Sequence, residues 1–86
     1  MSDTISFQAI SAMLDWKVTT PGQTWEAIGP DGFACRIERV TFGDGPYFPS
    51  AWRDTSRFFA PQEGFYTLQG AQAWCVDLIV GQRRAA

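Results

Sequence analysis

The sequence has 86 residues, a formal net charge of −2 and a pI near 4.8, with 45% apolar and 15% aromatic residues. A chain of this length makes one domain, which we assign to residues 1–86. The acidic balance disfavours direct nucleic-acid binding, which needs a basic surface. The absence of histidine removes the commonest general base and the commonest transition-metal ligand.

The first predicted elements are an ambiguous N-terminal segment and a strand. Residues 1–12 fit either a short helical turn or a loose N-terminal arm, because their apolar positions match both the strand and the helix period. In residues 13–18, Leu14, Trp16 and Val18 alternate with charged residues, as in a half-buried strand. Residues 19–23 then contain Pro-Gly in the order that a type II turn requires.

Residues 24–29 and 33–42 predict an antiparallel hairpin. The segment between them, Gly-Pro-Asp-Gly, is the strongest turn signal in the chain. The apolar alternation of the second of these strands changes phase near its end, which predicts a β-bulge near Arg39. Residues 47–53 form a weaker strand, and Pro49 places it at a sheet edge or interrupts it. Residues 54–63 are the longest irregular stretch.

The last element is a helix with Thr67 as N-cap and Gly81 as its stop. Its apolar stripe consists of Leu68, Ala71, Cys75, Leu78 and Ile79. The opposite face is also rather apolar and carries Ala73, Val76 and Val80. Two readings of this second face remain open: it packs into the concavity of the sheet, or it forms a homodimer or partner surface.

Together these elements predict an α+β fold, an antiparallel β-meander of three to four strands with one C-terminal α-helix packed across it. The sequence also allows a short helix at the N-terminus. Cys35 and Cys75 read as buried, reduced thiols that meet with the aromatic residues between sheet and helix. No apolar run approaches the length of a membrane span.

Catalytic and cofactor chemistry find little support in the sequence. Nucleophilic catalysis needs an activated nucleophile with a nearby base, and both cysteines lie on apolar stripes that raise a thiol pKa. The loop carboxylates, Asp31 and Asp44 among them, fit turn chemistry. Phosphate-binding glycine patterns and metal-ligand spacings are lacking. We therefore expect a protein that is not an enzyme and has no cofactor or metal.

Residues 52–59 form the stretch most typical of a binding surface, because they combine arginine with aromatic side chains, the types enriched at interface hot spots. The alternative is that its phenylalanines tuck under the sheet as a satellite of the core. If the segment binds a partner, the predicted contact residues are Trp52, Arg53, Arg57, Phe58 and Phe59. Two loop acids, Asp31 and Asp44, would meet basic groups of the partner.

The order of these motifs resembles small orphan proteins of phages and prophages, in which a tryptophan-bearing meander precedes a glycine–aromatic–cap–helix ending. The residues that carry the resemblance span about 14–80 and are Leu14, Trp16, Trp25, Ala27, Gly32, Phe33, Cys35, Ile37, Gly64, Tyr66, Thr67, Leu68, Ala71 and Trp74. The long segment 54–63, and Trp74 where a smaller residue is common, depart from the pattern.

The resemblance implies a cytoplasmic protein of a bacterial host that binds and inhibits a host protein complex. Its most concrete form is an anti-CRISPR-like counter-defence inhibitor, whose partner would be a CRISPR effector. This expectation is an analogy of size and build, and it transfers no functional residue. The alternative is a homodimeric structural or assembly module that uses Ala73, Val76 and Val80.

Overall fold

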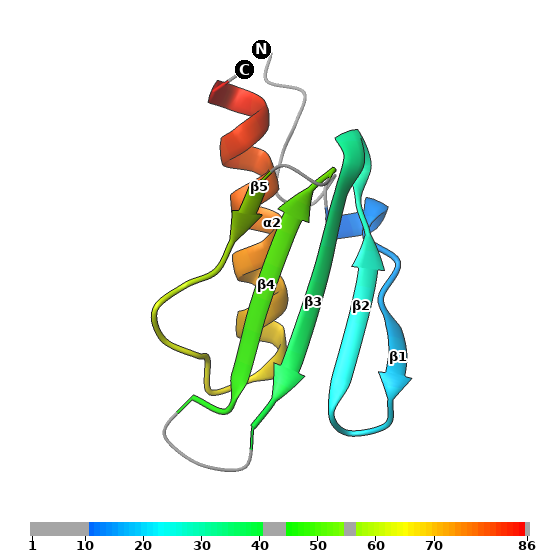
Figure 1. The fold of residues 1–86 in the computed structure, drawn as a ribbon, viewed down its shortest axis with the longest axis vertical. Coiled ribbons are helices and arrows are strands. Elements are labelled where there is room, and N and C mark those ends of the chain that lie inside the picture. The colour runs from blue at the N-terminus through cyan, green and yellow to red at the C-terminus, as the bar shows by residue number, and fades with distance from the viewer. Residues whose placement is uncertain (1–10, 41–44, 55–56, 86) are drawn as a thin grey trace.

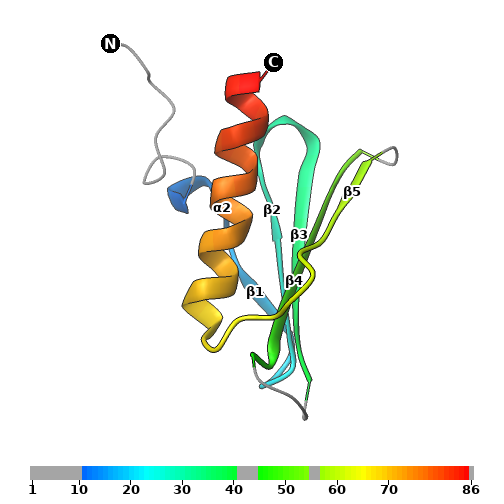
Figure 2. The same ribbon diagram turned by 90° about the vertical axis from the view of Figure 1, so that its left-hand side faces the viewer.

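The computed structural model, which describes residues 11–40, 45–54 and 57–85, is a five-stranded antiparallel sheet with a long helix across one face (Figures 1 and 2). Each strand pairs with its neighbour in sequence. The predicted α+β meander with a C-terminal helix is confirmed, with one strand more than expected. The elements are β1 (Lys17–Thr20), β2 (Thr24–Ile28), β3 (Phe33–Arg39), β4 (Tyr47–Arg53), β5 (Arg57–Phe59) and α2 (Leu68–Ala85).

The core lies between α2 and the sheet face turned toward it. Alternation along the central strands sends Phe33, Cys35 and Ile37 of β3 toward the helix, and the register pairs Cys35 with Ala27 on one side and Ala51 on the other. All of these side chains are buried. The helix contributes its own buried residues to the same core, which are Ala71, Cys75, Val76 and Ile79.

The start of α2 agrees with the sequence prediction, and its end does not. The Thr67 hydroxyl accepts a hydrogen bond from the Gly70 N–H at 3.0 Å, and the Thr67 carbonyl accepts one from the Ala71 N–H. Thr67 is therefore the N-cap. Gly81, predicted to stop the helix, lies inside it, because α2 continues to Ala85.

Gly81→Ala is expected to stabilise the domain by up to about 1 kcal/mol, because glycine in a helix loses more backbone entropy than alanine. A methyl group at this position would meet no atom within 4 Å. The free energy of unfolding from urea titration measures the effect. A decrease would contradict the open surroundings of Gly81 on α2.

Three strand boundaries differ from the sequence prediction. β1 begins at Lys17, because residues 11–13 form a helical turn that brings Leu14 into the core before the strand starts. β3 ends at Arg39, and its pairing with both neighbours is regular throughout, so no bulge forms in it. Residues 57–59, assigned to an irregular stretch, form the short edge strand β5.

Pro49 is tolerated within β4 because its nitrogen faces away from β3. The Tyr47 N–H donates to the Phe65 carbonyl on the other side of the strand, and alternate residues of a strand point their N–H groups to the same side. β5 pairs only with residues 51–53 of β4. The prediction that this strand lies at a sheet edge or is interrupted is therefore wrong for β4, which runs unbroken between β3 and β5, although residue 49 itself lies beyond the end of β5.

The segment before α2 is held against the start of β4 by close backbone contact. Tyr47 and Phe65 exchange two backbone hydrogen bonds, at 3.0 and 2.8 Å. Beside them, a Cβ on Gly45 would lie 2.7 Å from the Gly64 carbonyl oxygen, and a Cβ on Gly64 would overlap the Gly45 carbonyl oxygen. Two glycines therefore allow the two backbones to touch and fix where the helix begins.

Candidate functional site

The sheet alternation divides the predicted binding segment between two faces. Trp52 and Phe58 are paired across β4 and β5 on the face opposite α2, which we call the open face. Arg53 and Arg57 form the adjacent pair and point to the helix side. The Arg53 guanidinium lies 5.4 Å from the centre of the Phe33 ring, a cation–π contact.

The remaining predicted contact residues are placed as follows. Phe59 is half-buried against the core, with its ring centroid 6.4 Å from that of Phe33. The satellite-core alternative therefore holds for Phe59, while Phe58 is 70% exposed. Asp44 and the side chain of Asp31 lie outside the described part of the structure.

An apolar row crosses four strands of the open face. The register pairs Ile28 with Ala34, Ala34 with Trp52, and Trp52 with Phe58. Residues paired in this way have neighbouring side chains on one face. Ile28 is 73% exposed and Phe58 is 70% exposed. This apolar row, Ile28–Ala34–Trp52–Phe58, is exposed at its two ends and half-buried at Ala34 and Trp52, and it forms a contiguous apolar patch of the kind that marks interaction sites.

Paired charges border the apolar row. Arg36 lies on the open face of β3 and forms ion pairs with Glu38 at 3.1 Å and with Glu26 at 3.7 Å. Both pairs are close to half exposed, so each contributes little to stability. Along this side of the row, carboxylate groups therefore outnumber guanidinium groups.

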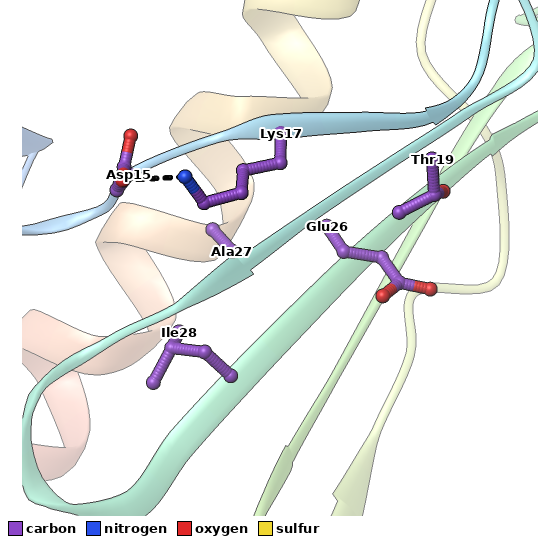
Figure 3. Close-up of a pocket in the computed structure, with 6 residues that line it drawn as sticks. All are labelled: Asp15, Lys17, Thr19, Glu26, Ala27 and Ile28. Atoms are coloured by element: carbon purple, nitrogen blue, oxygen red, sulfur yellow. Dashed lines mark ion pairs between the residues drawn. The ribbon is translucent and has the colours of Figure 1, made fainter.

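A hollow of about 220 Å³ lies beside the β1–β2 end of the apolar row (Figure 3). Ile28 belongs to both the row and the hollow, and Lys17 on β1 forms an ion pair with Asp15 at its rim, at 3.1 Å. The open face is thus not flat, because it has a depression that could receive a side chain next to exposed apolar surface. We call it the Lys17 hollow; its other lining residues are Thr19, Glu26 and Ala27.

A larger hollow, of about 420 Å³, lies between the start of β4 and the segment before α2. Its lining includes two exposed rings, those of Phe48 and Tyr66, and the carboxylate of Glu63. Phe48 is on the open face of β4, four residues before Trp52. We call it the Glu63 hollow; its other lining residues are Gly45, Gln62 and Gly64.

The two cysteines form a buried pair away from these surfaces. Both are free thiols with at most 1% of their surface exposed, as the sequence predicted. The pKa of the Cys75 thiol is raised, first because it donates a hydrogen bond to the sulfur of Cys35 and then because burial disfavours a thiolate. Such a thiol is a poor nucleophile. The same hydrogen bond lowers the pKa of Cys35, so the expectation of a raised pKa is wrong for that thiol, and it is its burial that keeps Cys35 from reacting.

The burial of the second helix face distinguishes the two readings of the sequence. Val76 is 2% exposed and belongs to the core, and Val80 packs against that core. Val76 is therefore not available to a surface of Ala73, Val76 and Val80, because the helix is buried over a wider arc than the apolar stripe alone. A helix laid on a sheet, the other reading of this face, accounts for Val76.

Comparison with models of protein families, with curated proteins and with solved structures found no match to this chain. Among the described residues, no helix combines the length and apolar character needed to cross a membrane. Within the same part of the chain, no three His, Cys, Asp or Glu side chains gather as metal ligands would. The site must therefore be interpreted from its own geometry.

Several residues of this surface were not singled out from the sequence. Ile28 and Ala34 alternate in phase with the polar residues Glu26, Arg36 and Glu38, which face away from the core. An isoleucine among these outward positions could have indicated an exposed apolar site. Ile28 and Ala34 align with Trp52 and Phe58 only through the register of three strand pairs, which cannot be predicted from the sequence. Glu63, Phe48 and Tyr66 come together only through the close Gly45–Gly64 contact.

Proposed function

We propose that this chain is a non-enzymatic interaction protein that binds a partner protein through the open face of its sheet. The observation that carries the proposal is the apolar row across β2, β3, β4 and β5, which is exposed at Ile28 and Phe58 and half-buried between them. Trp52 and Phe58 supply the large aromatic contact area that dominates interface energetics. The absence of histidine and the burial of both cysteines support a role without catalysis.

Charge favours a different protein over a second copy as the occupant. Around the apolar row and the two hollows, the described carboxylates of Asp15, Glu26, Glu38 and Glu63 outnumber the cationic groups of Lys17 and Arg36. If two copies met through this face, like charges would be brought together at a cost. A partner with basic side chains around an apolar patch would instead be complementary.

The more specific form of the proposal is a phage- or prophage-type protein that inhibits a host complex in the bacterial cytoplasm. A counter-defence protein that blocks a CRISPR effector is the most concrete version. Its support is the resemblance in size and motif order, together with the absence of residues suited to catalysis. The homodimeric assembly module through the helix is not favoured, because Val76 is buried.

Phe58→Asp is expected to reduce partner capture by at least about tenfold, because a hot-spot aromatic contributes about 2 kcal/mol or more. Tagged protein incubated with a bacterial lysate, followed by mass spectrometry, identifies stoichiometric partners, and the variants are then compared against the purified partner. The substitution should leave the fold intact, since the Phe58 side chain is largely exposed.

The matched control is Val18→Asp, which places the same group on an exposed strand residue that pairs with Trp25, away from the apolar row. It should keep full capture. Equal capture by wild type and Phe58→Asp would contradict the open-face assignment. Recovery of the chain alone, as a dimer in sedimentation, would contradict the heterologous partner.

A further inference from the structure

The Glu63 hollow has the composition of a site for an organic cation. Aromatic rings attract cations through the negative potential of their faces, and a carboxylate adds direct charge attraction. Phe48 and Tyr66 line the hollow with Glu63, and Tyr66 is 75% exposed. Among the described side chains, Glu63 has no ion-pair partner, whereas Glu26 and Glu38 on the same face are both paired with Arg36. The carboxylate of Glu63 is therefore available to a ligand.

The walls of the hollow are set before any ligand arrives. The Tyr47–Phe65 backbone bonds tie its two sides together, and the Gly45–Gly64 contact brings them into touch. The Phe48 ring packs so closely on Gly64 that a Cβ there would lie 2.9 Å from a ring carbon. A preformed site loses less conformational entropy on binding than one that must be ordered.

Two arginines of this chain already place their guanidinium groups above aromatic rings. Arg39 lies with its guanidinium carbon 5.9 Å from the centre of the Tyr47 ring, and Arg53 stands in the same relation to Phe33. In both cases the planar cation approaches a ring within the range of cation–π attraction. The Glu63 hollow offers two rings and a carboxylate, and no cation of the described chain occupies it.

We infer that the Glu63 hollow binds an arginine side chain of the partner protein. This inference rests on the proposed function and specifies the partner's chemistry. Phe48 and Trp52 are four residues apart on the same face of β4, which corresponds to roughly 13 Å. The partner therefore presents an arginine about that distance from the apolar group that covers Trp52 and Phe58. Arginine suits the site better than lysine, because its planar guanidinium both stacks on rings and pairs with a carboxylate.

The experiment is a titration of the isolated protein with N-acetyl-arginine amide, followed by NMR of the backbone amides. We expect saturable shifts centred on Gly45, Phe48, Gly64 and Tyr66. The neutral control ligand is N-acetyl-citrulline amide, which has nearly the same shape without the charge. It should bind at least about threefold more weakly, because it loses charge-assisted contacts of the kind measured at exposed sites.

Glu63→Gln is the test variant, and it should weaken arginine binding by roughly threefold to tenfold. Glu26→Gln is the matched control, because Glu26 is also paired with Arg36 but lies on β2, two strands away from the Phe48 wall of the hollow. It should change binding by less than about twofold. Equal affinity for the arginine and citrulline ligands, equal losses in both variants, or no saturable shift at about 100 mM ligand would overturn the inference.

These outcomes are separable from those of the proposed function. If Phe58→Asp abolishes partner capture while the arginine ligand does not bind, the open face remains an interaction surface and the cation site is wrong. If the arginine ligand binds selectively while Phe58→Asp has no effect on capture, the hollow stands and the apolar row is wrong. Within the complex, Glu63→Gln should lower partner affinity and reduce its dependence on salt.

Discussion

Val76→Asp is expected to unfold the domain. The Val76 side chain is 2% exposed and lies in the core with Cys75 and Ile79. A carboxylate at this position would lose its hydration without gaining a partner, which costs several kcal/mol. The whole domain is stabilised by only about 5–15 kcal/mol, so most of that stability is lost. Circular dichroism during urea or thermal unfolding measures the change.

Gln69→Asp is the control, since it introduces the same charged group at an exposed position in the first turn of α2. It should be neutral or slightly stabilising, because an acidic side chain near a helix N-terminus interacts favourably with the helix dipole. The opposite result is equally informative. A folded Val76→Asp protein that had changed only its oligomeric state would restore the helix as an interface and contradict the packing of α2.

Gly45→Ala is expected to lower the free energy of unfolding by about 2–4 kcal/mol. Its φ of +72° is unfavourable for alanine, by about 1–2 kcal/mol. A Cβ would also lie 2.7 Å from the Gly64 carbonyl oxygen and 2.8 Å from its carbon, so the two backbones must separate. Overpacking of this kind costs about 1–3 kcal/mol more. The Glu63 hollow should change shape with the separation, which the arginine ligand would report.

Gly22→Ala separates the two contributions. Gly22 has the same φ of +72°, in the turn where the Gln23 N–H donates to the Thr20 carbonyl, and a Cβ there meets nothing within 4 Å. This variant should lose only the backbone term, about 1 kcal/mol once the lower entropy of the unfolded chain is included. Equal losses in Gly22→Ala and Gly45→Ala would show that the backbone contact at Gly64 is not tight.

The sequence predicted correctly those features that depend only on neighbouring residues, such as a helix cap and a turn. Thr67 caps α2 because a hydroxyl at that position satisfies an N–H of the first turn, and Pro21-Gly22 makes the turn that its φ preferences dictate. The prediction that the helix stops at Gly81 was wrong, because glycine does not by itself end a helix, and α2 continues to Ala85. The sequence left two readings open for Val76, because the buried arc of a helix depends on how it lies on the sheet.

The candidate site was only partly predictable, for a reason of the same kind. Trp52 and Phe58 could be named from residue type, but alternation separates them from Arg53 and Arg57, once residues 57–59 are recognised as a strand. Each of the strands β2, β3, β4 and β5 contributes one residue to the apolar row, so no short stretch of sequence contains the whole row. The Glu63 hollow depends on a contact between two distant glycines, which only the folded chain brings together.

The order of elements along the chain has a consequence for synthesis. Every strand pairs with the strand made just before it, so the sheet needs only short loops to close and can grow hairpin by hairpin. The helix that covers its core face comes after all of them. Until α2 has emerged from the ribosome, the apolar faces of β3 and β4 have no cover. We expect stable folding only once the helix has emerged, a threshold that stalled nascent chains of graded length would reveal.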